Sequence, residues 1–311
     1  MKILSLFDGM SCGRLALDRA GIVIDKYFAS EIDRYAISIA KSNYPDTVHI
    51  GNVCDVYAYN LPPIDLLIGG SPCQGFSFAG KHLNFDDPRS QLFFEYVRVL
   101  KETKPKYFLM ENVRMSKQSM DAITDLLGVE PVAINSNLVS AQNRYRLYWT
   151  NIPMDGLPVD KGIMLKDILE NNYVTNRDKS HCIDANYFKG GNLKSYFEKH
   201  RRQLVFTKDG LCQVGETSEH QHYKHDQVKR VYHRKGKAPT LLTMQGGNRE
   251  PKVFVEPSQW RKLTVLECER LQTVPDNYTK GVSNTQRYKM LGNGWTIDVV
   301  AHIMKGIRRV Q

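Results

Sequence analysis

Cys73 lies in the segment of this chain with the clearest chemical potential, residues 70–74, with the sequence Gly-Ser-Pro-Cys-Gln. The segment follows the apolar run Leu66–Gly69, which predicts a buried strand of a parallel sheet. Open α/β sheets bind their ligands in loops after such strands, and the proline stiffens the backbone beside the sulfur. Cys73 is therefore either a nucleophile or an ordinary buried cysteine, which is the commoner fate of this residue.

One carboxylate and two arginines could form a reactive site together with Cys73. Glu111 follows the apolar run Tyr107–Met110, so we expect it at the same edge of the sheet as Cys73. A desolvated carboxyl there could keep a proton and donate it to a ring nitrogen; the alternative is a capping or surface glutamate. Arg144 and Arg146 alternate as in a strand, which puts both on one face. They are either site residues or surface arginines in salt bridges.

Two other strand ends favour a nucleotide-like cofactor. Residues 7–13 have the sequence Phe-Asp-Gly-Met-Ser-Cys-Gly, a glycine turn between a first strand and a first helix, where backbone N–H groups can approach a ligand. The turn does not follow the dinucleotide pattern Gly-x-Gly-x-x-Gly. Glu31 ends the second predicted strand, where an acid commonly accepts hydrogen bonds from ribose hydroxyls. Together the two features indicate a cofactor that contains adenosine.

The elements that must position these residues follow from apolar runs that alternate with helical patterns as far as Ile152. Strands are predicted at Ile3–Phe7, Lys26–Ser30, Leu66–Gly69, Tyr107–Met110, Val132–Leu138 and Arg146–Thr150. Helices are predicted at Gly13–Ala20, Arg34–Asn43, Ser90–Lys101 and Ser116–Leu127. This alternation predicts an α/β fold, with a mostly parallel sheet and helices on both faces.

In the rest of the chain, the composition and the pattern of apolar residues change twice. Asp155 to Pro257 holds 18 Lys and Arg against 13 Asp and Glu, with interleaved aromatic residues, which suits either a module that faces phosphates and bases or a solvated insertion. Helical patterning then returns: Thr264 is expected to cap a helix, and Trp295–Arg309 is expected to form an amphipathic one. We expect a catalytic domain over 1–153, a recognition domain over 154–258, and a segment over 259–311 that returns to the first domain.

The composition of the chain limits the binding partners and the cellular compartment that we expect for it. The 311 residues carry a formal charge of +10 and a pI near 9.2, which suits a polyanion such as nucleic acid or simply a solvated basic surface. No run predicts a signal peptide or a membrane span, and the 6 cysteines are scattered, so we expect a cytoplasmic protein without a membrane partner. We expect no metal, because the metal-type residues fit no common zinc spacing. These residues are His181, Cys182, Cys212, His220, His222 and His225.

In their order along nearly the whole chain, these motifs resemble those of the DNA cytosine-5 methyltransferases. The resemblance implies a Rossmann-like sheet that binds S-adenosyl-L-methionine. The residues it assigns to the cofactor are Phe7, Asp8, Gly9, Met10, Ser11, Cys12, Gly13, Glu31, Ile32, Asn52, Val53, Pro72, Leu92, Asn293 and Trp295. Asn52 stands where the family usually has aspartate, with Asp55 as a nearby alternative. Trp295 replaces the commoner small aliphatic residue, as in the de novo DNA methyltransferases.

The same resemblance implies a chemistry for the catalytic residues. Residues 71–77, 111–113 and 142–146 are similar to the family's nucleophile, Glu-Asn-Val and Gln-x-Arg-x-Arg motifs. Cys73 would add to C6 of a cytosine flipped out of the duplex, after which C5 accepts the methyl group. Glu111 would hydrogen-bond N3 and the exocyclic amine, and Arg146 would bind O2. Arg144 would help to hold the site, and either Arg144 or Arg146 would favour the thiolate of Cys73. Residues 78–89 would form a loop that closes over the base.

The resemblance also implies a double-stranded DNA partner, bound by a monomer. The residues assigned to DNA are Gln74, Ser77, Arg89, Thr240, Leu241, Gly246 and Gly247. The target sequence does not follow from the chain, and neither does the choice between a restriction endonuclease as cellular partner and an orphan, phage or regulatory role. One alternative is a transfer-RNA cytosine-5 methyltransferase, whose Cys-Phe-Thr signature is absent here. Another is a non-catalytic DNA-binding homologue, a class that usually lacks the nucleophile.

Overall fold

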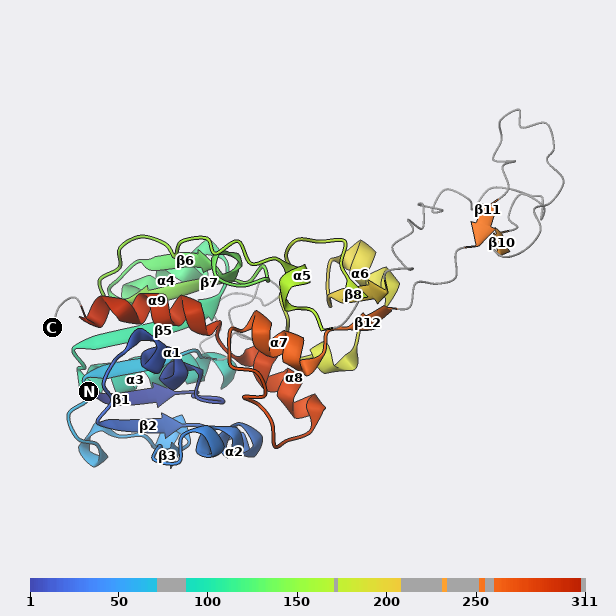
Figure 1. Cartoon of the computed structure of the whole chain (residues 1–311). Helices are drawn as coiled ribbons and strands as arrows, with labels where there is room; N and C mark the ends of the chain where they lie inside the picture. The colour runs from blue at the N-terminus through green and yellow to red at the C-terminus, as the bar shows by residue number, and fades with distance from the viewer. Residues whose placement is uncertain (72–87, 171–172, 208–230, 234–251, 255–259, 309–311) are drawn as a thin grey trace.

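The protein is built on a seven-stranded sheet with the strand order β3-β2-β1-β4-β5-β7-β6 (Figure 1). The structure, a computed structural model, describes residues 1–71, 88–170, 173–207, 231–233, 252–254 and 260–308. The strands are β1 (Lys2–Leu6), β2 (Lys26–Ser30), β3 (Val48–Gly51), β4 (Leu66–Gly69), β5 (Tyr107–Val113), β6 (Pro131–Asn135) and β7 (Tyr145–Thr150). Only β7 runs against its neighbours in this sheet, so the predicted mostly parallel sheet is confirmed.

Helices cover both faces of the sheet, as the alternating pattern predicts. These helices are α1 (Cys12–Ala20), α2 (Arg34–Asn43), α3 (Pro88–Thr103), α4 (Lys117–Leu127) and α9 (Ile297–Arg308). Residues of α1, α2 and α9 share a core with Ile3 and Ile68, whereas residues of α3 and α4 share a second core with Leu4 and Leu67. Successive residues of one strand thus enter opposite cores, which is the side-chain alternation of a sheet buried on both sides.

Several predicted boundaries were wrong for local reasons. The first strand ends at Leu6, because Phe7 adopts the left-handed backbone conformation, with φ of 57°. The strand predicted to reach Leu138 ends at Asn135, whose side chain accepts from the N–H of Asn137 and starts a short 3₁₀ helix. The edge strand β3 was missed because it is short and only partly buried. The last helix begins at Ile297, so Trp295 lies in the turn before it.

A smaller sheet lies beyond the helices α7 (Val265–Leu271) and α8 (Asn284–Asn293) (Figure 1). Its strands are β8 (Tyr173–Val174), β9 (Leu204–Thr207) and β12 (Trp260–Lys262), all antiparallel, and the short helices α5 (Leu165–Ile168) and α6 (Leu193–Lys199) belong to the same stretch. Two further strands, β10 (Val231–His233) and β11 (Lys252–Phe254), pair in parallel. Among the described residues, no helix is long and apolar enough to cross a bilayer.

The segment after β12 packs back against the large sheet. The predicted capping box is confirmed: Thr264 accepts from the N–H of Glu267, and the Glu267 carboxylate accepts from the N–H of Thr264. Farther on, α9 lies beside α1 (Figure 1), and Arg19 of α1 pairs with Asp298 of α9. Gly306 of α9 packs against the backbone of Pro153: a Cβ added to this glycine would be 1.8 Å from the carbonyl oxygen of Pro153.

Candidate active site

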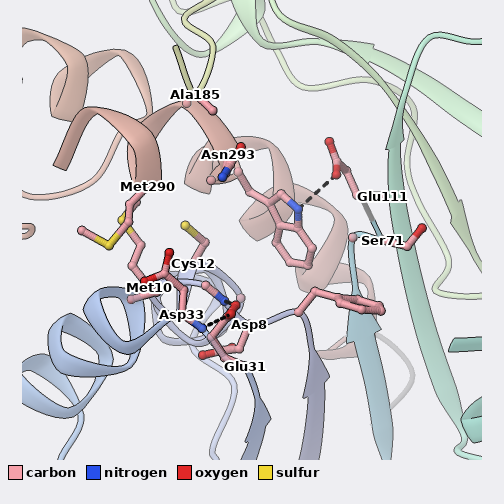
Figure 2. Close-up of a pocket in the computed structure, with 18 of the residues that line it drawn as sticks. Asp8, Met10, Cys12, Glu31, Asp33, Ser71, Glu111, Ala185, Met290 and Asn293 are labelled. Carbon is pink, nitrogen blue, oxygen red and sulfur yellow. Dashed lines mark hydrogen bonds between the residues drawn. The ribbon is translucent and has the colours of Figure 1, made fainter. Parts of the chain in front are cut away.

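A cavity of about 580 Å³ opens beyond the carboxyl ends of β1, β2, β4 and β5. This size is typical of small-molecule sites, and the location is the one that open α/β sheets use for ligands. Asp8 and Glu31 lie on one side of the cavity, whereas Ser71 and Glu111 lie on the other (Figure 2). The cavity therefore joins the end of the predicted cofactor turn to the end of the strand that leads to Cys73.

The turn that follows β1 has an unusual backbone. Phe7, Gly9 and Ser11 all adopt left-handed conformations, with φ of 57°, 60° and 63°. Only Gly9 does so freely, so the surrounding contacts must hold the other two residues. Asp8 supplies such contacts, because its carboxylate accepts from the hydroxyl of Ser11 at 2.6 Å and from that of Tyr27 at 2.7 Å. Burial raises the pKa of Asp8 against the effect of these donors.

Glu31 is held rigidly at the end of β2. Its Oε2 accepts from the N–H of Gly9 at 2.8 Å, and its Oε1 accepts from the N–H groups of Ile32 at 2.7 Å and Asp33 at 2.8 Å. A carboxylate has about four acceptor positions, so it can still bind a hydroxyl group. The next residue, Ile32, lines the cavity yet is 74% exposed. A carboxylate beside an exposed apolar side chain fits a ribose with an attached base.

Other parts of the cavity wall also fit such a cofactor. Asn52 and Val53 line it, whereas Asp55 does not, so the geometry favours Asn52 of the two residues considered for the adenine contact. The side-chain oxygen of Asn52 caps a 3₁₀ helix by accepting from Cys54. The hydroxyl of Ser71 lines the cavity, is buried and has no hydrogen-bond partner among the described residues. A buried polar atom of this kind requires a partner that a ligand could supply.

Each carboxylate oxygen of Glu111 has a partner. Arg146 Nε forms an ion pair with Oε1 at 2.9 Å. The indole N–H of Trp295 donates to Oε2 at 3.2 Å, the contact drawn as a dashed line at Glu111 in Figure 2. Burial is the largest single effect and lowers the pKa of Arg146, but the Glu111 carboxylate, Cys182 and Tyr148 together outweigh burial and raise the pKa of the guanidinium. Glu111 lies within β5 and is only 8% exposed, so neither the capping nor the surface alternative for this residue is correct.

Arg144 is buried and has a different set of partners. Its guanidinium donates to the carbonyl oxygens of Gly294 at 2.8 Å, Gly292 at 3.2 Å and Ile183 at 3.1 Å, and to the sulfur of Cys182 at 3.4 Å. Both arginines line the cavity, and Arg144 is 3% exposed and the Arg146 side chain 14%, so they are not surface arginines, although Arg146 does form a salt bridge, with Glu111. Arg144 ties the turn before α9 to the segment around Cys182, and thereby shapes the wall opposite the cofactor turn.

Most of the residues assigned to the cofactor and to catalysis meet in this cavity. Those that line it are Phe7, Asp8, Gly9, Met10, Cys12, Gly13, Glu31, Ile32, Asn52, Val53, Leu92, Glu111, Arg144, Arg146, Asn293 and Trp295. Ser11 does not line it, because its hydroxyl turns inward to Asp8. Residues that lie outside the described part of the chain are Pro72, Cys73, Gln74, Ser77, Thr240, Leu241, Gly246, Gly247 and the side chain of Arg89.

The cavity also includes residues that the sequence did not assign to it. Cys182, Ile183, Asp184 and Ala185 come from the basic stretch, and Lys289 and Met290 come from α8. Their approach depends on Gly292, where an added Cβ would be 2.2 Å from the backbone of Asp184. Among the described residues, no group of three His, Cys, Asp or Glu side chains could hold a metal ion. Of the residues considered above for zinc, only His181 and Cys182 lie in the described part of the chain.

Comparisons with known proteins agree with this geometry. The family model for C-5 cytosine-specific DNA methylases matches residues 1–127 and 129–309. The type II methyltransferase M1.ScrFI of Lactococcus lactis subsp. cremoris is 29% identical over 99% of this chain and 78% of its own length. The type II methyltransferase M.FnuDI of Fusobacterium nucleatum is 28% identical over 99% of this chain and 94% of its own.

A solved structure shows the same fold. The Dnmt2 methyltransferase of S. pombe superposes with a TM-score of 0.61 at 17% identity, over 100% of this chain and 99% of its own. The family match extends over both sides of the cavity, from the cofactor turn to the turn that carries Trp295. This chain belongs to the C-5 cytosine-specific DNA methylases, a family of methyltransferases that use S-adenosyl-L-methionine.

Proposed function

We propose that this protein transfers a methyl group from S-adenosyl-L-methionine to C5 of a cytosine within a short sequence of double-stranded DNA. The target base leaves the duplex and is attacked at C6 by Cys73. The observation that carries the proposal is the single cavity that joins Glu31 and the cofactor turn to Glu111 and Arg146, beside Ser71. Ser71 lines the cavity and lies two positions before Cys73 in the sequence, so we propose that Cys73 acts at this cavity.

Specific residues of the cavity could hold each part of the cofactor. Glu31 would accept hydrogen bonds from the ribose hydroxyls, and Ile32 would cover one face of the adenine. Asn52 and Val53 would line its edge, and the backbone after Phe7 would approach the methionyl part. Pro72, Leu92, Asn293 and Trp295 complete the proposed set. When bound, the cofactor supplies a methyl group that is open to attack by carbon.

The reaction requires C5 of cytosine to become a nucleophile. The thiolate of Cys73 forms a bond to C6, while the proton of Glu111 passes to N3, so that electron density collects at C5. Arg146 binds O2, since its guanidinium carries five N–H donors and the Glu111 contact uses only part of them. After C5 takes the methyl group, which would leave S-adenosyl-L-homocysteine, a base removes the C5 proton, the bond between C6 and sulfur breaks, and the N3 proton returns to Glu111. This cleavage releases methylated DNA and the free thiolate.

The remaining assignments belong to the same proposal. Residues 154–258 would form the recognition domain between a catalytic domain over 1–153 and a returning segment over 259–311. The DNA contacts would come from Gln74, Ser77, Arg89, Thr240, Leu241, Gly246 and Gly247. We infer a monomer on DNA in the cytoplasm, associated with the nucleoid. A restriction endonuclease is a candidate cellular partner, because the relatives named above are type II methyltransferases.

The experiment compares wild-type protein with Cys73→Ala in methyl transfer from tritiated cofactor to duplex DNA. We expect transfer by the wild type, no transfer by Cys73→Ala, and full activity of the control Cys54→Ala, since Cys54 is an exposed free cysteine. A duplex with 5-fluorocytosine at the target should trap a covalent complex with wild type only, because fluorine cannot leave as the C5 proton does. Transfer by Cys73→Ala would contradict the mechanism. Transfer to RNA alone would favour the transfer-RNA alternative, and no transfer to either would favour the non-catalytic homologue.

A further inference from the structure

Trp295 meets Glu111 at a point where three segments of the chain converge. The indole N–H donates to Oε2 of Glu111 at 3.2 Å. Gly70, at the end of β4, lies directly against this contact: an added Cβ would be 2.9 Å from the same Oε2 and 3.0 Å from the indole nitrogen. Only glycine leaves room for the pair without displacement. The hydrogen bond therefore lies against the backbone that leads to Cys73.

The turn that carries Trp295 is fixed from two sides. The carbonyl oxygen of Gly294 accepts from Arg144 at 2.8 Å and from the amide of Gln272 at 3.1 Å. On the other side, the hydroxyl of Thr296 donates to the side-chain oxygen of Gln272 at 2.9 Å. Because the flanking backbone is held in this way, the indole has little freedom to leave Glu111.

The indole also reaches across the cavity wall. Its benzene edge lies near the first turn of α1, at 3.4 Å from the position of a Cβ added to Gly13. Its nitrogen faces the opposite way, toward Glu111. Trp295 thus extends from the side of the cavity assigned to the cofactor to the side assigned to the base.

We propose that Trp295 is a positioning residue for Glu111, with its indole N–H fixing Oε2 while Arg146 fixes Oε1. This inference rests on the proposed function. An indole N–H only donates, so it cannot take the proton that Glu111 gives to N3. Once that proton has left, both donors stabilise the carboxylate that remains. Arg144 contributes indirectly, because it holds the turn from which Trp295 reaches Glu111.

The first test is Trp295→Phe, which keeps an aromatic wall and removes the donor. We expect the single-turnover rate of methyl transfer to fall about 10- to 100-fold, the factor that one hydrogen bond to a charged group contributes. The Kd for the cofactor should change less than about threefold, since the ring remains. In a Glu111→Ala background, which lacks the acceptor, the same substitution should cost little more. The proposal would be overturned if Trp295→Phe transferred methyl groups at the wild-type rate. It would also be overturned if Trp295→Phe lowered the rate by the same factor in the Glu111 variant as in the wild type.

A second readout needs no activity. The chain has 3 tryptophans, so indole ¹⁵N–¹H resonances of the free protein can be assigned by substitution. Glu111→Ala should move the Trp295 resonance upfield as its acceptor is lost. The Trp149 resonance should stay in place, because that indole donates to Thr124. An unmoved Trp295 resonance refutes the contact, whereas a wild-type protein that methylates no DNA refutes the proposed function instead.

Discussion

Arg144 directly precedes β7 and reaches the turn before α9, where its guanidinium donates to the carbonyl oxygen of Gly294 at 2.8 Å. Gly294 directly precedes Trp295, which in turn contacts Glu111. The two arginines of one short motif therefore act on the same carboxylate by different routes. Arg146 binds it directly, whereas Arg144 holds the backbone that brings the second donor.

Arg144→Met should damage the fold as well as the site. Methionine replaces the aliphatic part of the side chain but removes the Arg144 donor from the carbonyl oxygens of Gly292, Gly294 and Ile183, of which Gly294 keeps a second donor in Gln272. We expect the free energy of unfolding to fall by about 2–4 kcal/mol, since buried acceptors lose charged partners. Urea denaturation measures this loss. The matched control is Arg34→Met, which removes an exposed arginine bonded to its neighbour Tyr35, and should change stability by less than about 0.5 kcal/mol. Equal stability of both variants would contradict the structural role of Arg144.

Glu31→Ala should weaken binding of S-adenosyl-L-methionine. The substitution removes the acceptor of three backbone N–H groups as well as the proposed ribose contact. We expect the Kd from isothermal titration calorimetry to rise at least about 100-fold, because charged hydrogen bonds to the ligand and the shape of the turn are lost together. Glu31→Gln should lose less, since its carbonyl oxygen still accepts. Asp25→Asn, at an exposed carboxylate paired with the N-terminus, should bind the cofactor like wild type. Unchanged affinity of Glu31→Ala would remove Glu31 from the site.

The pH dependence of stability should report the ion pairs of Asp298. Burial raises the pKa of this carboxyl, but hydrogen bonds from Lys161 and Arg19 outweigh burial and lower the pKa below its usual 3.8. A pKa that is lower in the folded than in the unfolded state stabilises the fold above pH 3.8, and this contribution disappears as the pH falls through the folded value. Urea unfolding should therefore show wild type more stable than Asp298→Asn at pH 7, with a gap that narrows below pH 3.8. A gap that is constant with pH would contradict the assignment.

Gly306→Ala tests how the last helix packs. An added Cβ would be 1.8 Å from the carbonyl oxygen of Pro153 and 2.9 Å from the side chain of Ile152. The backbone at Pro153 would have to move to make room for the methyl group, and such a shift is unfavourable. We therefore expect the free energy of unfolding to fall by more than about 2 kcal/mol. Ala301→Gly in the same helix should cost only about 1 kcal/mol from helix propensity plus a small cavity. If Gly306→Ala is as stable as wild type, α9 does not pack against this part of the chain as described.

The sequence by itself determined the α/β class, the strands β2 and β4 with their ends, and the capping box of Thr264 and Glu267. These features are local, because apolar alternation and capping depend on residues close together in the chain. The ordered motifs also indicated the family and most residues of the cavity.

Only the tertiary structure decided which donors Glu111 receives. Trp295 and Glu111 are separated by 184 positions in the sequence, and no periodicity relates them. Likewise, Arg144 and Arg146 look equivalent in sequence, yet one binds backbone carbonyl groups and the other a carboxylate. The approach of Asp184 to Gly292 and the left-handed conformations of Phe7 and Ser11 were also invisible in the sequence. Such features arise from packing between distant segments, which determines partners that residue type and spacing leave open.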